Sequence, residues 1–367
     1  MTISATTQGI KPGVCTSTNR PSAPFDGQVI YMTDVDQTAV WDGTQWTVLA
    51  PIAGGRNSLI NGGMDIYQRG SISAAGYALD RWYFSTYGTS WNSLSVTQQT
   101  SGAPTNFRYY MRVAAGSATS TNISFGQSLE THNVIKLAGK VVNLSFYYRV
   151  NTNFSTAFTV TPVFTTGTDA NISTVPNGTA IGSSQTVTNT TAWTRFSYSF
   201  TVPSNATSFA IQFWNNGNTV STASLDITGV QVEAGAVATP FEFEDYSTTL
   251  AKCQRYYETS YNGVAKGTST AAGVVYASSS TDQYGSYILP SPLWLIPKRT
   301  TPSVTTYSQA GTINKWNYYR SGVSDQEINV NLSSGYNSPR STLLYISTGV
   351  AFVSATGYGH FVADAEL

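Results

Sequence analysis

Apolar and polar side chains alternate strictly from Arg195 to Val202, where the sequence reads Arg-Phe-Ser-Tyr-Ser-Phe-Thr-Val. A period of two places every apolar side chain on one face of an extended strand, whereas a helix would scatter them around its surface. Further strand-like segments, separated by turns rich in Asn, Gly and Pro, are Val141–Val150, Ala157–Phe164, Ser208–Trp214 and Ser224–Glu233. We therefore predict a jelly-roll sandwich of about eight to ten strands across residues 57–246.

The composition supports β structure and excludes several classes of partner. Hydrophobic residues make up 41% of the 367 residues and aromatic residues 13%, which is ample for packed cores. The 19 basic and 19 acidic side chains cancel, so the chain lacks the excess of Lys and Arg that nucleic acid or an anionic membrane would attract. No apolar run approaches the ~18 residues of a membrane span, and the N-terminus lacks the features of a signal peptide. We expect a protein made in a cytoplasm that neither binds nucleic acid nor inserts into a membrane.

A small β-meander is predicted within residues 1–56, after an irregular lead-in up to residue 20. Its three strand candidates are Gln28–Thr33, Thr38–Trp41 and Gln45–Leu49, and Asp42-Gly43 is a strong hairpin signal between the last two. A meander of this size cannot bury enough surface to fold alone, so it must pack on a neighbouring domain or on copies of itself. We therefore assign 1–56 as an assembly or attachment segment, with candidate contact residues Phe25, Val29, Tyr31, Trp41 and Trp46.

One helix is predicted to link the sandwich to a last β block. It is expected over Thr248–Glu258, within a linking segment 247–259, with Ser247 as its cap and with Leu250, Cys253 and Tyr257 on one face. Residues 260–367 are predicted to form a C-terminal β-sandwich, with strands at Gly273–Ala277, Tyr284–Leu289, Ser303–Tyr307, Glu327–Val330, Leu343–Ile346 and Ala351–Val353. The predicted fold class is thus all-β, with a meander, a central jelly roll, one linking helix and a C-terminal sandwich.

Residues that carry enzymatic or metal chemistry are scarce. The two cysteines, Cys15 and Cys253, could pair with each other but have no zinc-binding spacing. Of the two histidines, we interpret His132 as an exposed polar residue and His360 as a packing residue. Phosphate-binding loops and GxSxG motifs are absent. We predict no cofactor and no metal, while calcium held by Asp and carbonyl oxygens stays an open alternative.

A glycosidase would need two suitably spaced carboxylates. The acidic residues considered are Asp80, Glu130, Asp169, Asp226, Glu233, Glu242, Glu244 and Asp245. The last three cluster beside Phe241 and Phe243, and we interpret them as solvated charges at the end of a strand, because proximity in sequence does not establish a coupled acid pair. We therefore predict that the protein is not an enzyme.

Aromatic rings are the better indication of function. Sugars stack their C–H faces on such rings and bond to neutral polar groups, and this chain is rich in both. The candidate ligand-binding residues lie in or around expected loops of the C-terminal block: Tyr284, Trp294, Trp316 and Tyr318. The alternative is that most rings fill cores or subunit interfaces.

Three stretches carry a resemblance to a known family. They read GVCTSTNRPSAPFDGQVIYMTDVDQTAVWDGTQWTVL (Gly13–Leu49), NSLINGGMDIYQRG with ALDRWYF (Asn57–Gly70, Ala78–Phe84) and DITGVQVEAGAVATPFEFEDYSTTLAKCQRYYE (Asp226–Glu258). They resemble tailed-phage virion proteins of the tail-fibre type. The first is similar to a short N-terminal module, and the others are similar to the two ends of a jelly-roll domain that resembles carbohydrate-binding modules. Val232 stands where the family usually has Leu.

The resemblance implies a structural virion component, made in the host cytoplasm, that forms homotrimers. Its N-terminal segment would attach to other virion proteins, of the tail or of the capsid, and its distal β domains would contact a host cell-surface glycan. The alternatives are a capsid decoration or head-fibre protein, a free carbohydrate-binding protein, and a glycan-cleaving tailspike. The tailspike would need a β-helix repeat or a convincing acid pair, and neither is visible in the sequence.

Overall fold

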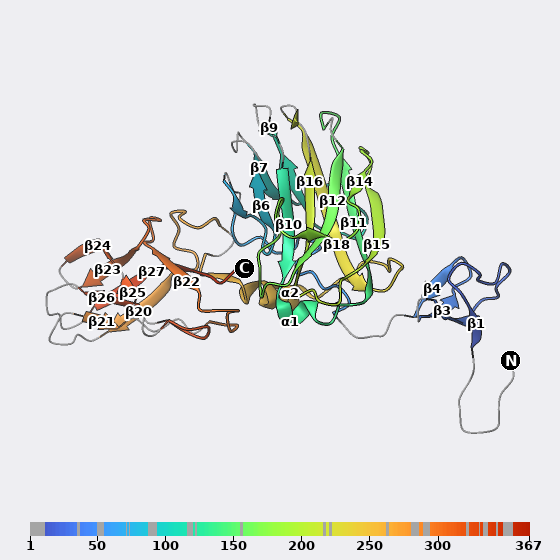
Figure 1. Cartoon of the computed structure of the whole chain (residues 1–367). Helices are drawn as coiled ribbons and strands as arrows, with labels where there is room; N and C mark the ends of the chain where they lie inside the picture. Colours follow the sequence, from blue (N-terminus) through green and yellow to red (C-terminus); the bar gives the residue numbers. More distant parts are fainter. Residues whose placement is uncertain are drawn as a thin grey trace, which may run out of the picture.

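The computed structural model confirms the all-β class and shows three β blocks that follow one another along the chain (Figure 1). It describes residues 12–34, 37–49, 55–70, 72, 74–86, 94–115, 120–121, 123–154, 157–215, 218–219, 222–261, 264–279, 286–288, 294–320, 323–329, 331–332, 337–342, 344–347 and 355–367. No helix in these ranges is long and apolar enough to cross a membrane.

The N-terminal block is one sheet with the strand order β1-β2-β3-β4. The strands are β1 (Gly13–Cys15), β2 (Val29–Met32), β3 (Gln37–Trp41) and β4 (Trp46–Val48). The hairpins were predicted, but β1 corrects the expectation of an irregular lead-in, since it pairs in parallel with β2. Its three residues are too few to show a period of two, and Val14 is 56% exposed. Ile30, Met32 and Ala39 form a core of only three fully buried side chains.

Two antiparallel sheets form the central sandwich. One has the order β13-β12-β16-β10-β6-β5, with β14 also paired to β12, and the other has the order β15-β11-β18-β8-β7. The strands of the first sheet are β5 (Gly76–Tyr77), β6 (Tyr83–Thr86), β10 (Ile123–Leu129), β12 (Phe158–Thr165), β13 (Thr179–Ala180), β14 (Gln185–Val187) and β16 (Ser208–Asn215). Those of the five-stranded sheet are β7 (Ser95–Gln99), β8 (Tyr110–Ala114), β11 (Val141–Val150), β15 (Thr194–Thr201) and β18 (Ser224–Ala234). A small pair, β9 (Ser120–Thr121) and β17 (Asn218–Thr219), completes this block.

The predicted alternation decides which side chains fill the sandwich core. Phe196, Tyr198 and Phe200 of β15 all face the other sheet, where they pack against the buried cluster. Rings dominate that cluster, which includes Trp82, Phe84, Phe125, Phe146, Phe158, Phe209 and Phe213. Burying a single large apolar side chain stabilises the fold by about 1.5–3 kcal/mol, so these buried rings contribute much of the free energy that stabilises the sandwich.

The linking helix is shorter than predicted and has a different cap. Helix α2 covers Tyr246–Gln254, and the carboxylate of Asp245, rather than Ser247, caps it by accepting from the Ser247 amide. The chain then becomes extended as β19 (Tyr257–Thr259), which pairs with the last strand of the C-terminal block. A second short helix, α1 (Thr131–Val134), was not predicted. Cys253 is buried in α2, and both cysteines are free, so the possible disulfide is not formed.

The C-terminal block is built around one long strand, β27 (Ala355–Asp364), which was not predicted. It pairs with four others, so that the larger sheet contains β19, β20 (Val275–Ser279), β22 (Ser303–Tyr307), β23 (Lys315–Arg320), β24 (Val323–Asn329) and β27. A second sheet has the order β21-β26-β25, formed by Ser286–Ile288, Leu344–Ser347 and Asn331–Leu332. The strand expected at 351–353 lies outside the described residues.

A buried ionic cluster, here called the joint, ties the sandwich to the C-terminal block. The carboxylate of Glu366 accepts from Arg69 at 2.7 Å and also from Arg81, and all three side chains are at most 6% exposed. Each guanidinium also lies over a ring that follows α2, Arg69 over Tyr257 at 3.7 Å and Arg81 over Tyr256 at 3.5 Å. Burial by itself would lower the pKa of both arginines, but Glu366 and the neighbouring ionisable groups together outweigh it and keep both above their ordinary value. Two of the stretches that carry the family resemblance therefore meet at this joint.

Candidate functional site

The rings predicted to bind ligand lie in the core of the C-terminal block. Trp316 is 1% exposed, Tyr318 is 4% exposed and Trp294 is 6% exposed, while Tyr284 lies outside the described residues. Both indole N–H groups donate to backbone carbonyls, of His360 and of Ser338. A ring this deeply buried offers no face to a sugar, so the structure gives these three residues a packing role. The segment expected to be a loop is strand β23.

Alternation along β23 turns two neighbouring side chains outward instead. Tyr319 is 54% exposed, and Asn317 pairs in register with Tyr358 of β27, which in turn pairs with Tyr276 of β20. The rings of Tyr276 and Tyr358 stack with centroids 5.4 Å apart, and Tyr276 is 62% exposed. We call Tyr276, Asn317, Tyr319 and Tyr358 the tyrosine row. Burial, followed by a hydrogen bond to Asp325, raises the pKa of Tyr358 to about 12, which holds this ring as the neutral phenol.

A second aromatic surface covers the outer face of the five-stranded sheet. Its charged part is one row across neighbouring strands, in which Arg149 of β11 pairs in register with Asp226 of β18, and Asp226 with Arg112 of β8. Asp226 is buried and accepts from Arg112 through both oxygens, at 2.7 and 2.8 Å, and from Arg149 at 2.8 Å. The hydrogen bond to Asp226 is the main cause that raises the pKa of Arg112. One buried carboxylate thus fixes two guanidinium groups on the sheet.

Aromatic rings lie next to this charged row. Trp193 is half-buried, with the Arg149 guanidinium 4.7 Å from its ring and Tyr110 packed edge-on against it at 5.2 Å. The indole N–H donates to the Gly102 carbonyl, which fixes the ring in the loop before β15. The hydroxyl of Tyr110 accepts from both Arg112 and Arg149. Rings and guanidinium groups therefore hold one another in place.

Further along the same face, four rings cluster where the pairing of β11 with β18 shifts register, between Ser145 and Tyr147. Phe107 lies between 5.1 and 5.3 Å from Tyr147, Phe241 and Phe243, of which Phe243 is 58% exposed. Gly229 makes this packing possible, because it adopts φ +61° and a Cβ there would lie 2.6 Å from the Phe107 ring. Residues Phe107, Arg108, Tyr110, Arg112, Tyr147, Arg149, Trp193, Arg195, Asp226, Phe241 and Phe243 are called the ring-and-arginine surface below.

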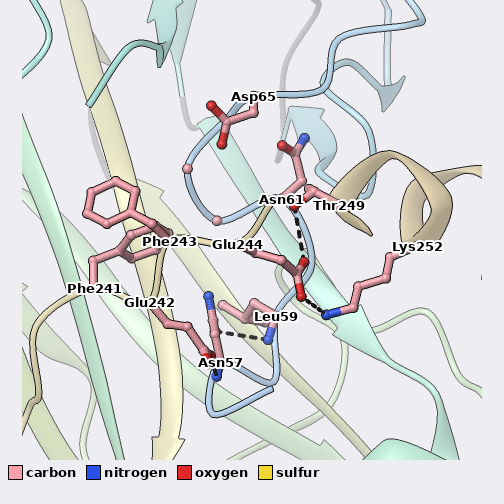
Figure 2. A pocket seen from close by; sticks show the side chains of 12 residues that line it. Asn57, Leu59, Asn61, Asp65, Phe241, Glu242, Phe243, Glu244, Thr249 and Lys252 are labelled. Carbon is pink, nitrogen blue, oxygen red and sulfur yellow. Dashed lines mark hydrogen bonds and ion pairs between the residues drawn. The ribbon is translucent and has the colours of Figure 1, made fainter. Parts of the chain in front are cut away.

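The hollow beside Phe241 and Phe243 is too small for a sugar (Figure 2). Its volume is about 30 Å³, which is room for one or two water molecules. Glu244 and Lys252 pair across it, and the Thr249 hydroxyl also donates to Glu244. Figure 2 shows the two Phe side chains on one side of this hollow and the Glu244–Lys252 pair on the other, so the aromatic cluster borders the hollow.

Every acidic side chain considered as a catalytic candidate has a protein partner. Asp80 accepts from Gln68, Glu130 from Arg255, Asp169 from Arg299 and Glu233 from Thr239. Glu242 was expected to be a solvated charge. It instead accepts hydrogen bonds from the backbone amides of residues 55 and 57. Each of these carboxylates therefore has a structural role. In the described part of the chain, no group of three or more His, Cys, Asp or Glu side chains gathers to hold a metal.

The two histidines lie as predicted. His132 is exposed on α1. His360 is fully buried, stacks on Tyr261 at 4.0 Å and is held between the Ser260 hydroxyl and the Thr270 carbonyl.

The predicted assembly residues lie on the N-terminal sheet and beside it. Phe25 is 68% exposed and Val29 is 40% exposed, while Tyr31 is half-buried. Trp41 and Trp46 are also half-buried and pack edge-to-face with centroids 5.6 Å apart. Their role in assembly stays a prediction.

Part of the ring-and-arginine surface is signalled by the alternation along two strands. In Val141–Val150 and Thr194–Val202 the apolar side chains point inward, so the residues between them, which include Tyr147, Arg149 and Arg195, must point outward. No pattern within one strand shows that these side chains share a surface with Arg112 and Phe241, because this depends on strand order.

Comparisons with known proteins support only a distant likeness. No family model matches the chain, and no curated protein matches it. Among solved structures, it is similar to the enzymatically active domain of bacteriophage CBA120 tailspike protein 4, with 17% identity and a TM-score of 0.33 over 49% of this chain and 21% of that one. A CBM4 module matches with 19% identity and a TM-score of 0.32 over 47% of this chain and 97% of the module. A putative sugar-binding protein from Bacteroides thetaiotaomicron matches with 11% identity and a TM-score of 0.33 over 48% of this chain and 99% of that one. The chain thus spans about a fifth of the tailspike structure, and similarity at this level carries no functional information.

Proposed function

We propose that this protein is a structural, non-enzymatic component of a phage virion, of the tail-fibre type, that contacts host surface glycan through its β domains. The observation that carries the glycan contact is the ring-and-arginine surface. It offers the half-buried Trp193 and the exposed Phe243 beside hydrogen-bond donors that are already fixed in position. Preorganised donors next to flat apolar rings are what a sugar needs, because its C–H faces stack while its hydroxyls bond.

The sequence resemblance supports the placement of the protein on a virion. The order of modules fits such a component: a small sheet at the N-terminus, then a sandwich, a short helix and a second β block. The N-terminal sheet exposes Val14, Phe25 and Val29 and has only a small core of its own, so contacts with other chains would stabilise it. In this proposal the N-terminal sheet docks on other virion proteins, and three copies of the chain assemble.

Glycan binding tests the first part of the proposal. Titration of a glycan library should find a ligand whose affinity falls at least about tenfold in Trp193→Ala. Trp214→Ala is the matched control, since Trp214 is also a half-buried tryptophan but belongs to the opposite sheet, where its N–H donates to Thr161. Equal losses in both variants, or no binding to any glycan, would contradict the proposal.

Native mass tests the assembly. Three copies of the 39.4 kDa chain give about 118 kDa by light scattering. A monomer that still binds glycan would favour the alternative of a free carbohydrate-binding protein.

A further inference from the structure

We propose that the ring-and-arginine surface selects acidic glycans, which are chains of sugar rings that carry carboxylate or sulfate groups. The inference rests on the proposed glycan contact and adds the chemical class of the ligand.

The charge of this surface is out of balance with the rest of the protein. The whole chain has a formal net charge of zero, with only 10% of its residues charged. Arg112, Arg149 and Arg195 lie on this surface, and the exposed Arg108 follows Phe107 in the chain. The carboxylates on and beside it are Asp226, Asp65 and Glu233, which shares Thr239 with Arg195. Glu242 and Glu244 are balanced by Arg56 and Lys252. The local excess is therefore one positive charge. A surface potential of this sign attracts anionic groups and repels cationic ones.

The arginines also keep donors for a ligand. Arg112 and Arg149 use Nε and one terminal nitrogen to reach Asp226 and Tyr110, and among the described residues the other terminal nitrogen, Nη1, of each donates to no partner. Arg195 similarly uses one terminal nitrogen, for Ser145 and Thr239. A planar guanidinium whose inner edge is already fixed can present its outer edge to a carboxylate or sulfate with little loss of side-chain entropy.

The rings decide in favour of a glycan over a simple anion. The Arg149 guanidinium lies over one face of the Trp193 ring, 4.7 Å from its centroid, and the Phe107 cluster continues the aromatic surface. An inorganic anion would gain nothing from these rings, whereas a sugar with an acidic substituent can place its ring on the aromatic face and its charge on the arginine. Nucleic acid also combines rings and charge, and the test below includes it as a competing ligand.

The experiment compares three polysaccharides, and oligothymidylate as the competing nucleic acid, on the full-length protein, with binding measured by calorimetry at low and at moderate salt. Polygalacturonate supplies carboxylates, dextran sulfate supplies sulfates and dextran is neutral. The test variant is Arg108→Gln with Arg149→Gln, which leaves Arg112 holding both oxygens of Asp226. The control is Lys136→Gln with Lys140→Gln, which removes two exposed cations near α1 and changes the net charge by the same amount.

We expect binding to one or both acidic polymers, none to dextran, and a loss of about fivefold or more in the arginine variant with no loss in the lysine control. Equal losses in the two variants would overturn the inference, because binding would then be general charge attraction. Equal binding of dextran, sensitive to Trp193→Ala, would overturn the acidic selectivity while leaving the proposed glycan contact intact. Tighter binding of oligothymidylate than of either acidic polymer would overturn it in favour of nucleic acid. Failure of every polymer and of the glycan library would overturn both proposals.

Discussion

Replacing Glu366 with Gln should weaken the fold more than any change to a surface charge. The Glu366 carboxylate is buried between Arg69 and Arg81, whose side chains are 6% and 2% exposed. Glutamine keeps the size of the side chain but removes the negative charge, which leaves two buried cations with less compensation. Removing one partner of a buried ion pair typically costs about 3–5 kcal/mol.

The remaining contacts place the expected loss at the lower end of that range. Arg69 keeps Asp364 at 3.1 Å, and Arg81 keeps the Ser128 carbonyl at 2.8 Å. We therefore expect a loss of about 3 kcal/mol, which corresponds to a fall in melting temperature of roughly 6–12 °C for a domain of this size. Scanning calorimetry would measure it, and hydrogen exchange along β27 would show whether the C-terminal block opens first.

Glu244→Gln is the matched control. Glu244 pairs with Lys252, but the two side chains are 29% and 39% exposed, and an exposed pair contributes about 0–1 kcal/mol. If Glu366→Gln costs no more than this control, the joint does not depend on its charges and our reasoning about it is wrong.

Four further predictions address other parts of the molecule. Gly229→Ala should lower the free energy of unfolding, measured in urea, by about 1–2 kcal/mol through strain at φ +61°, plus the cost of displacing Phe107. Gly182→Ala is the control, because Gly182 has φ +68° but its nearest neighbour is 3.9 Å away, so this variant should show the strain alone. Equal losses in the two variants would argue against the clash with Phe107. Burial lowers the pKa of His360 below 6.5, so its contribution to stability is present above pH 6.5 and is lost as the pH falls through the folded pKa. The melting temperature of the C-terminal block should therefore drop on acidification, and its dependence on pH should be weaker in His360→Gln. The same dependence on pH in both proteins would contradict this. Tyr276→Ala should change the melting temperature of the purified protein by no more than about 2 °C, since the ring is mostly exposed, and a larger thermal shift would assign it to packing. Deletion of residues 1–50 should abolish attachment to the particle and leave both larger blocks folded, and a truncated chain that still attaches would refute the role of that segment.

The sequence predicted the sandwich strands well where one face is apolar. Val141–Val150 and Thr194–Thr201 pair with each other in register, and both were expected from their alternation. Strand β27 was missed for a physical reason, since Gly357 and Gly359 interrupt the pattern. A Cβ at Gly359 would lie 2.4 Å from the Trp316 indole, so the glycine lets a tryptophan lie directly on this central strand.

The candidate site was harder to predict than the fold. Trp316 and Tyr318 were chosen as ligand-binding residues because they are aromatic, but in a strand the outward-facing residues are their neighbours, the half-buried Asn317 and the exposed Tyr319. The ring-and-arginine surface combines side chains from β8, β11 and β18 with a tryptophan just before β15. These side chains meet because β18 pairs with both β11 and β8, and the sequence of a single strand does not reveal which strands pair. A functional surface on a sheet depends on which strands are neighbours, whereas the alternation of residues shows only which side chains of one strand share a face.

The joint also has a mechanical consequence. Besides Glu366, the connection between the blocks includes Arg299 with Asp169, and the chain itself passes through α2 directly into β19. A pull on the outer end of the C-terminal block would load these contacts together rather than one flexible linker. Force applied to one block would then reach the other with little bending at the joint, so the two blocks should move as one rigid unit when either of them is bound to a surface.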